Sequence, residues 1–117
     1  MPELVPAYLC HSDLGLMLYD CNRPGIYRGQ HPLKLYEYAA AGLSILSTPH
    51  AEYQYIAPPV IQLRGVDEIA SAIDLALAER GTWSSRARQF AEQYSWTVKF
   101  KQVESIIANL LGEVRTA

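Results

Sequence analysis

The most constraining feature of the sequence is the stretch 30–49, QHPLKLYEYAAAGLSILSTP, in which a helical pattern leads through a glycine into a short apolar run. Proline is tolerated at the first position of a helix, and glycine readily adopts the left-handed conformation that ends one. We therefore predict a helix from Pro32 to Ala41 that Gly42 ends. The run 43–47 is apolar enough for a strand covered on both faces, as in a parallel sheet. The stretch thus predicts one helix–strand step of an α/β fold.

Two further runs, 14–19 and 60–63, have the same apolar character, and helical patterns separate and follow them. This alternation favours an α/β domain with right-handed crossovers. We predict a single domain over residues 1–117, a three-layer, Rossmann-like partial domain with about three parallel strands near 14–19, 43–47 and 60–63 and with C-terminal helices. The other predicted helical segments are 2–11, a single turn at 51–57, 67–81, 82–92 and 95–112.

Several helix ends and faces can be predicted from single residues. Gly81 and Gly112 are predicted to stop their helices, while Thr82 and Ser95 are predicted to cap the helices that follow them. The N-terminal helix is expected to bury Leu4, Val5, Tyr8 and Leu9. Helix 67–81 is expected to bury Ile69, Ala72, Ile73, Ala76 and Leu77. The last helix carries an apolar face made of Val98, Val103, Ile106, Ile107, Leu110 and Leu111.

Lys34 and Glu37 are three residues apart and therefore share one side of the predicted helix. A lysine in the first turn lies at the positive end of the helix dipole, where a bound anion would offset the mismatch. The alternative is an ordinary solvated ion pair worth about 0.2–0.5 kcal/mol. The loop 20–31 leaves a strand at its carboxyl end, where open parallel sheets bind ligands, so we expect loop contacts from Arg23 and Arg28. A solvated loop with two arginines is an equally open reading.

The segment PLKLYEYAAAGLSIL resembles the donor-binding segment of GT-B fold glycosyltransferases, in particular bacterial sugar transferases with a Pro-Leu-Lys-Leu-x-Glu-Tyr helix in the C-terminal domain. The similarity extends to VPAYL at 5–9, SDLGL at 12–16 and YSW at 94–96. Gly29 stands where many retaining members carry a second glutamate. The resemblance implies that Glu37 hydrogen-bonds the ribose hydroxyls and that Lys34 lies near the diphosphate of a nucleotide sugar. The donor nucleotide-binding residues that we then expect are Gln30, His31, Pro32, Leu33, Lys34 and Glu37.

The resemblance covers the second half of a GT-B C-terminal domain, so we expect no catalytic residue in this chain and no turnover by it alone. The implied substrate is a UDP- or GDP-sugar, with no other cofactor, used in polysaccharide biosynthesis once an N-terminal glycosyltransferase half completes the site. The alternative is a non-catalytic protein-interaction module descended from a glycosyltransferase. A receiver-like α/β domain is a third reading, in which Asp20 would be the phosphorylated residue, although no acidic pair accompanies it.

Composition narrows the classes of partner. The chain has 117 residues, a net charge of −2 and no basic run, which argues against binding to nucleic acid. It contains no apolar stretch of about 20 residues and no signal pattern, so we predict a cytoplasmic protein that does not span a membrane. Cys10 and Cys21 are predicted to be packing residues. His11 and His31 have no recognised ligand spacing to Asp13 or Asp20, so we expect no metal site.

The strand 14–19 raises a question of its own. If the three strands are the last ones of a doubly wound sheet, this strand lies at an edge, because its usual neighbour is absent from the chain. Long, apolar, uncharged edges tend to associate with other strands. We therefore expect the edge to pair with another copy in a homo-oligomer or with another polypeptide, unless a misassigned element of this chain covers it.

Overall fold

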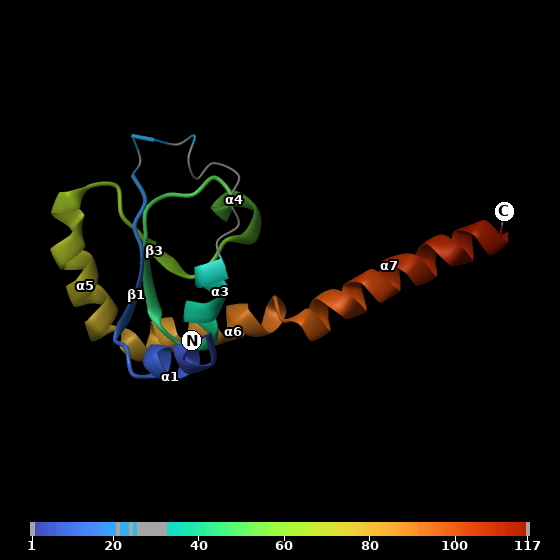
Figure 1. The fold of residues 1–117 in the computed structure, drawn as a ribbon. Coiled ribbons are helices and arrows are strands. Elements are labelled where there is room, and N and C mark those ends of the chain that lie inside the picture. The colour runs from blue at the N-terminus through green and yellow to red at the C-terminus, as the bar shows by residue number, and fades with distance from the viewer. Residues whose placement is uncertain (1, 21, 24, 26–32, 117) are drawn as a thin grey trace.

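The computed structural model describes residues 2–20, 22–23, 25 and 33–116. Its sheet is parallel and has the order β1-β2-β3, with β1 at Leu14–Met17, β2 at Ser44–Ser47 and β3 at Val60–Gln62 (Figure 1). This confirms a mixed α/β chain with a three-stranded parallel sheet. The helical elements are η1 (Pro2–Leu4), α1 (Val5–Cys10), α3 (Leu33–Ala40), α4 (Tyr53–Ile56), η2 (Val66–Glu68), α5 (Ile69–Ala78), α6 (Arg80–Gln93) and α7 (Trp96–Thr116).

The strands are shorter than the apolar runs that predicted them. β1 ends at Met17 because the next amide available to a neighbour, that of Tyr19, donates to the Thr48 hydroxyl at 3.1 Å and leaves the ladder. β2 begins after Leu43, whose amide donates to the Tyr38 carbonyl at 3.0 Å and so belongs to the helix end. The backbone beyond β3 still follows β2, since the amide of residue 63 donates to the carbonyl of residue 47 at 2.8 Å.

One face of the sheet is covered by α3, α4 and α6. Leu35 and Ala39, four residues apart on α3, are fully buried and pack against the sheet. The inward side of α6 carries Ala87 and Phe90, and Phe90 also stacks on the Tyr36 ring with 5.7 Å between centroids. The buried residues of this cluster are Met17, Leu35, Ala39, Ile45, Tyr53, Ala87 and Phe90.

The opposite face of the sheet is covered by α5. Its Ala72 and Ala76 are buried against Leu46 and Leu63, which confirms the predicted stripe at its centre. Small side chains at these two positions allow the helix to lie close to the strands. Leu77 is exposed, so its predicted burial is wrong: it lies about 100° around the helix from the buried Ala76.

The turn after α3 is the place where the chain needs a left-handed residue. Gly42 has φ of +72°, and its amide donates to the Ala39 carbonyl at 3.0 Å. A β-carbon at Gly42 would lie 2.5 Å from Nε of Arg88 and 2.9 Å from Oγ of Ser84. Gly42 therefore ends the helix as predicted, and α6 packs directly against the turn. The predicted first helical residue, Pro32, lies outside the described residues.

The other two predicted glycine stops are wrong. α5 already ends at Ala78, and Gly81 lies in the first turn of α6, which begins at Arg80 rather than after a Thr82 cap. Glu79 makes the bend with φ of −106° and ψ of 27°, so no left-handed residue is required there. Glycine permits a stop but does not impose one. At α4, by contrast, the predicted single turn is confirmed, and Ala57 ends it in the left-handed region with φ of 42°.

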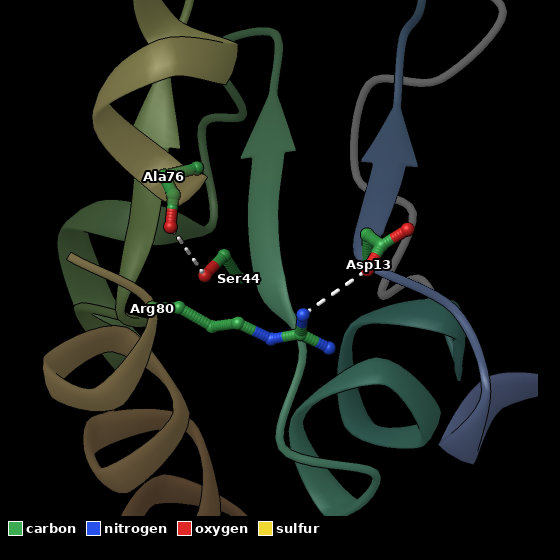
Figure 2. Close-up of polar contacts among 4 residues, drawn as sticks. All are labelled: Asp13, Ser44, Ala76 and Arg80. Atoms are coloured by element: carbon green, nitrogen blue, oxygen red, sulfur yellow. Dashed lines mark hydrogen bonds and ion pairs between the residues drawn. The ribbon is translucent and has the colours of Figure 1, made fainter. Parts of the chain in front are cut away.

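Two polar contacts join elements at the amino edge of the sheet. Figure 2 shows the Arg80 side chain reaching beneath the start of β2, where Nη1 donates to Oδ1 of Asp13 at 3.1 Å. The buried Ser44 hydroxyl donates to the Ala76 carbonyl at 3.5 Å. These contacts connect the segment before β1 to the start of α6, and β2 to the end of α5.

The N-terminal helix is less well covered than predicted. Leu4, Val5 and Tyr8 are exposed, and only Leu9 of the four expected core residues is partly buried. Cys10 is an exposed free cysteine, so its predicted packing role is wrong; Cys21 lies outside the described residues. The physical reason is the length of α1, since its six residues face the end of α3 across a small hollow and have little surface to pack on.

The edge position of β1 is confirmed within the described sheet. β1 pairs with β2 alone, and its Leu16 side chain is about half exposed, as is that of Leu18 just after the strand. No described element of this chain covers that edge through backbone pairing. An apolar edge of this kind is open to another strand.

The last helix, α7, runs away from the rest of the molecule (Figure 1). The Ser95 hydroxyl accepts a hydrogen bond from the Val98 amide at 3.3 Å, which confirms the predicted cap. The helix continues through Gly112, so the predicted stop there is wrong. Most of its predicted apolar face is half exposed or more, at Val103, Ile106, Ile107, Leu110 and Leu111.

Candidate ligand site at the carboxyl edge of the sheet

The three strand ends meet at one edge of the sheet. The register sets Met17 beside Ser47 and Ser47 beside Gln62, so the connections that follow all leave from the same side. In open parallel sheets this carboxyl edge is where ligands bind. The residues directly after the strands, 18–20, 48–50 and 63–65, are therefore the first candidates for contacts with a ligand.

A pocket of about 380 Å³ lies among these connections, within the size range of small-molecule sites. The segments that follow all three strands contribute to it, and so does the start of α5. Asp20 and Arg64 are its charged residues, one of each sign. The lining residues are Leu18, Tyr19, Asp20, Asn22, Thr48, Leu63, Arg64, Gly65, Val66 and Ile69.

Thr48 holds the β1 side of the pocket in place. Its amide donates to the Met17 carbonyl at 3.0 Å, and its hydroxyl accepts from the Tyr19 amide at 3.1 Å and donates to the Met17 carbonyl at 3.4 Å. A threonine side chain thus replaces the backbone ladder where the strands diverge. This positions Tyr19 as a wall of the pocket.

The loop after β3 is held by an acidic cap. Glu68 accepts a hydrogen bond from the Arg64 amide at 2.9 Å through Oε2, and its own amide donates to the Gly65 carbonyl at 3.2 Å. This contact fixes the backbone of Arg64, whose exposed side chain belongs to the lining of the pocket. Its guanidinium offers five N–H donors that suit a phosphate.

Asp20 and Arg23 form the opposite rim. The Asp20 carboxylate accepts from the Asn22 amide at 3.0 Å and lies 3.7 Å from Nε of Arg23. Both side chains are more than half exposed, so the pair is weak. Arg23, expected to contact a ligand from this loop, therefore lies beside the pocket and partly neutralises Asp20.

A buried polar cluster supports the pocket from behind. The Tyr53 hydroxyl and the Ser47 hydroxyl are 2.6 Å apart, and the Ser47 hydroxyl also donates to the Thr48 carbonyl at 2.8 Å. The His50 ring packs between Tyr53, at 5.4 Å, and the edge of Tyr19, at 5.2 Å. The cluster therefore connects the end of β2 to the pocket wall formed by Tyr19.

Burial determines how this cluster titrates. Burial lowers the pKa of His50, and the nearby Glu52 carboxylate offsets part of that lowering. The imidazole is therefore neutral at pH 7. Burial raises the pKa of Tyr53, opposed in part by its hydrogen bond with Ser47. At neutral pH the cluster thus carries no charge, and Arg64 and Asp20 set the electrostatics of the pocket.

The predicted donor-binding residues are placed differently. Lys34 and Glu37 are both exposed on α3, and no ion pair joins these two described residues. Glu37 borders a small hollow of about 320 Å³ between α1 and α3. That hollow is largely apolar, with Pro2, Val5, Pro6, Leu9, Cys10, Ala40 and Ala41. It shares no residue with the pocket at the carboxyl edge.

The remaining predicted contacts can be placed only in part. Leu33 is strongly exposed at the first described position of α3, while Arg28, Gln30, His31 and Pro32 lie outside the described residues. Because β1 and β2 are parallel, α3 runs back from the carboxyl edge, so its first turn with Lys34 begins near the same edge as the pocket. α3 covers one face of the sheet, whereas the pocket opens beside α5 on the other.

Sequence reasoning missed Arg64, Thr48 and His50. The signal for all three is their position, since each follows a strand by one to three residues. Among the described residues, no group of three or more His, Cys, Asp and Glu side chains is arranged to hold a metal ion. None of the described helices combines the length and apolarity needed to cross a bilayer.

Comparisons with protein-family models, curated proteins and solved structures give no match to this chain.

Proposed function

We propose that this chain is the donor-nucleotide half of a glycosyltransferase-like protein, built on a partial Rossmann-like sheet. The observation that supports this most is that the segments after all three strands line one pocket, together with an exposed arginine whose backbone is held by Glu68. A nucleoside diphosphate has a flat, partly apolar base and a doubly charged phosphate group. The pocket offers matching chemistry, with Leu18, Leu63 and Ile69 as apolar walls and Arg64 as the cation.

In this proposal the donor lies across the carboxyl edge of the sheet. Arg64 on the α5 side and Lys34 in the first turn of α3 balance the diphosphate charge from two sides. The amides around Gln30 to Leu33 and the positive end of the helix add to that balance. Glu37 holds the ribose hydroxyls, as the sequence resemblance implies. For Glu37 to do so, the ligand must extend along α3 toward α1.

The bound donor is a UDP- or GDP-sugar, and the chain alone gives no turnover. Its cations would stabilise the nucleoside diphosphate as negative charge develops on the leaving group. Acceptor binding and the catalytic base would come from an N-terminal glycosyltransferase half. This division assigns donor recognition to the present chain and the chemistry to the completed protein.

A second function is favoured by a different observation, the exposed apolar surfaces of α7 and of the β1 edge. We infer that the chain also acts as a protein-interaction module. This function does not depend on nucleotide binding, and it would remain if the donor site were only an inheritance from a glycosyltransferase.

The donor proposal is tested by NMR titration of the isotope-labelled chain with UDP and with GDP. We expect shifts at Tyr19, Thr48 and Gly65 and along the first turns of α3. Arg64→Ala should weaken binding by about tenfold or more, because a hydrogen bond to a charged group is worth about 1.5–3 kcal/mol. Lys101→Ala removes an exposed cation from α7 and is the matched control.

Glu37→Ala tests the predicted ribose contact. It should abolish nucleotide binding and leave the fold intact, as judged by circular dichroism, because Glu37 is exposed and its loss opens no cavity. A folded chain whose spectrum does not change at millimolar UDP or GDP would contradict the donor proposal. Binding that survives Glu37→Ala but fails in Arg64→Ala would restrict the site to the pocket beside α5.

A further inference from the structure

The exposed side of α7 has the spacing of a coiled-coil seam. Trp96, Phe100, Val103, Ile107 and Leu110 follow one another at intervals of four, three, four and three residues. This is the a/d pattern with which two helices pack against each other. The five side chains are between 50% and 78% exposed, although each is large and apolar. α7 therefore presents a complete seam that nothing in the described chain covers.

The seam points away from the body of the molecule. Val98 and Gln102 line the shallow groove where α7 bends away from α6. At about 100° per residue, these two positions lie on the side of α7 opposite to Phe100 and Ile107. A partner helix can thus reach the seam without displacing α6 or the sheet.

We propose that the occupant of this seam is the α7 helix of a second copy of this chain, packed in parallel and in register. The proposal rests on the interaction function proposed above and names its partner. In a parallel pair, a flanking residue meets the residue five positions later on the other helix. Glu104 of the second copy then lies beside Lys99, whose ammonium is 4.5 Å from the Tyr94 ring centre in the single chain and exchanges that contact for the carboxylate. Ile106 lies beside Leu111. Each flanking pair is complementary, one in charge and the other in apolarity.

The opposite orientation lacks this match. An antiparallel pair that overlaps the whole seam sets Val103 against Val103 but Ile107 against Lys99, and it brings Glu104 beside Glu104 of the second copy. Two carboxylates at such a position repel each other, whereas in the parallel pair each of the two Glu104 side chains lies beside a Lys99 of the other copy. The charge pattern therefore selects the parallel arrangement, in which both bodies lie at the same end with the seam between them.

The first test is the mass of the purified full chain by size-exclusion chromatography with light scattering over a range of concentrations. We expect a dimer with twice the 13.1 kDa mass of the chain. Ile107→Glu places a carboxylate in the seam and should give a monomer of unchanged helix content. Ser105→Glu adds the same charge on the opposite side of α7 and should remain a dimer. A monomeric wild-type chain, or a dimer that persists in Ile107→Glu, would overturn the proposal.

Orientation is tested by cross-linking at Ile107 in a background with Cys10→Ser and Cys21→Ser. In the parallel pair the two copies of residue 107 face each other, whereas in the antiparallel pair residue 107 faces Lys99, so Ile107→Cys should form a disulfide-linked dimer in air only in the parallel arrangement. Failure to cross-link in a protein that is still dimeric would overturn the parallel arrangement. The nucleotide titration is a separate measurement, so loss of the dimer and loss of donor binding can be distinguished.

Discussion

The body of the molecule and its last helix differ in what their apolar faces meet. In the body, residues at helical spacing on α3, α5 and α6 are buried against the two faces of a three-stranded sheet. In α7 the same kind of spacing leaves large apolar side chains in water (Figure 1). Hydrophobic periodicity thus indicates which face of a helix is suited to burial, but not whether the same chain buries it.

We expect the largest difference in stability between the two regions when the same substitution is made at a phenylalanine in each. Phe90 in α6 is 6% exposed and packs on Tyr94 at 4.6 Å, whereas Phe100 in α7 is 61% exposed. Phe90→Ala should lower the free energy of unfolding by about 3–5 kcal/mol, because it opens a cavity in the core. Phe100→Ala should change it by no more than about 0.5 kcal/mol in dilute, monomeric protein. Urea unfolding followed by tyrosine fluorescence measures both.

If the parallel dimer forms, the two variants should also differ in concentrated protein. Phe100→Ala should then weaken dimerisation, whereas Phe90→Ala should lower the stability of the fold. Equal losses of stability for the two variants in dilute protein would contradict the separation into a packed body and an uncovered helix.

Two glycines should respond in opposite directions to the same substitution. Gly42→Ala forces a left-handed alanine against Arg88 and Ser84, and should lower stability by about 1–2 kcal/mol. Gly112 lies within α7 with open space around a β-carbon. Gly112→Ala should therefore raise the helix content of α7, since alanine is favoured over glycine there by about 0.5–1 kcal/mol.

Circular dichroism melts of the two alanine variants measure this difference. The control is Gly81→Ala, at a helical position in α6 with no atom within 4 Å of the added carbon, which should behave like Gly112→Ala. A Gly42→Ala variant as stable as the wild type would show that the turn tolerates alanine by shifting Arg88.

The same glycines show how far the sequence could predict the fold. Apolar runs between helical patterns were enough to predict the three parallel strands. Gly42 was correctly predicted to end its helix, because a strand starts directly after it. Gly81 and Gly112 were wrong stops, since neither position requires a turn of that kind. The predicted burial of Cys10 and of the apolar residues of α1 was wrong for another reason, namely that a six-residue helix facing the end of α3 lacks a surface to bury them.

The site was less predictable than the fold. Local spacing singled out Lys34 and Glu37 because both lie on one recognisable helix. Arg64 joins the pocket because β3 ends beside β2, whose other neighbour is β1, and this is a property of the sheet and not of the residues next to Arg64 in sequence. A parallel sheet predicts where such residues gather, and the structure is needed to know which of them face the same pocket.

The smallest expected effect is a pH dependence that belongs to the body alone. Because burial lowers the pKa of His50 in the folded state, the unfolded chain binds more protons below about pH 6.5, the usual histidine value. Stability should therefore be constant well above that value and fall as the pH drops below it, by less than about 1.4 kcal/mol per pH unit. His50→Gln should flatten this slope. Urea unfolding at several pH values measures the slope, and a slope unchanged in His50→Gln would mean that another group in the body carries the proton.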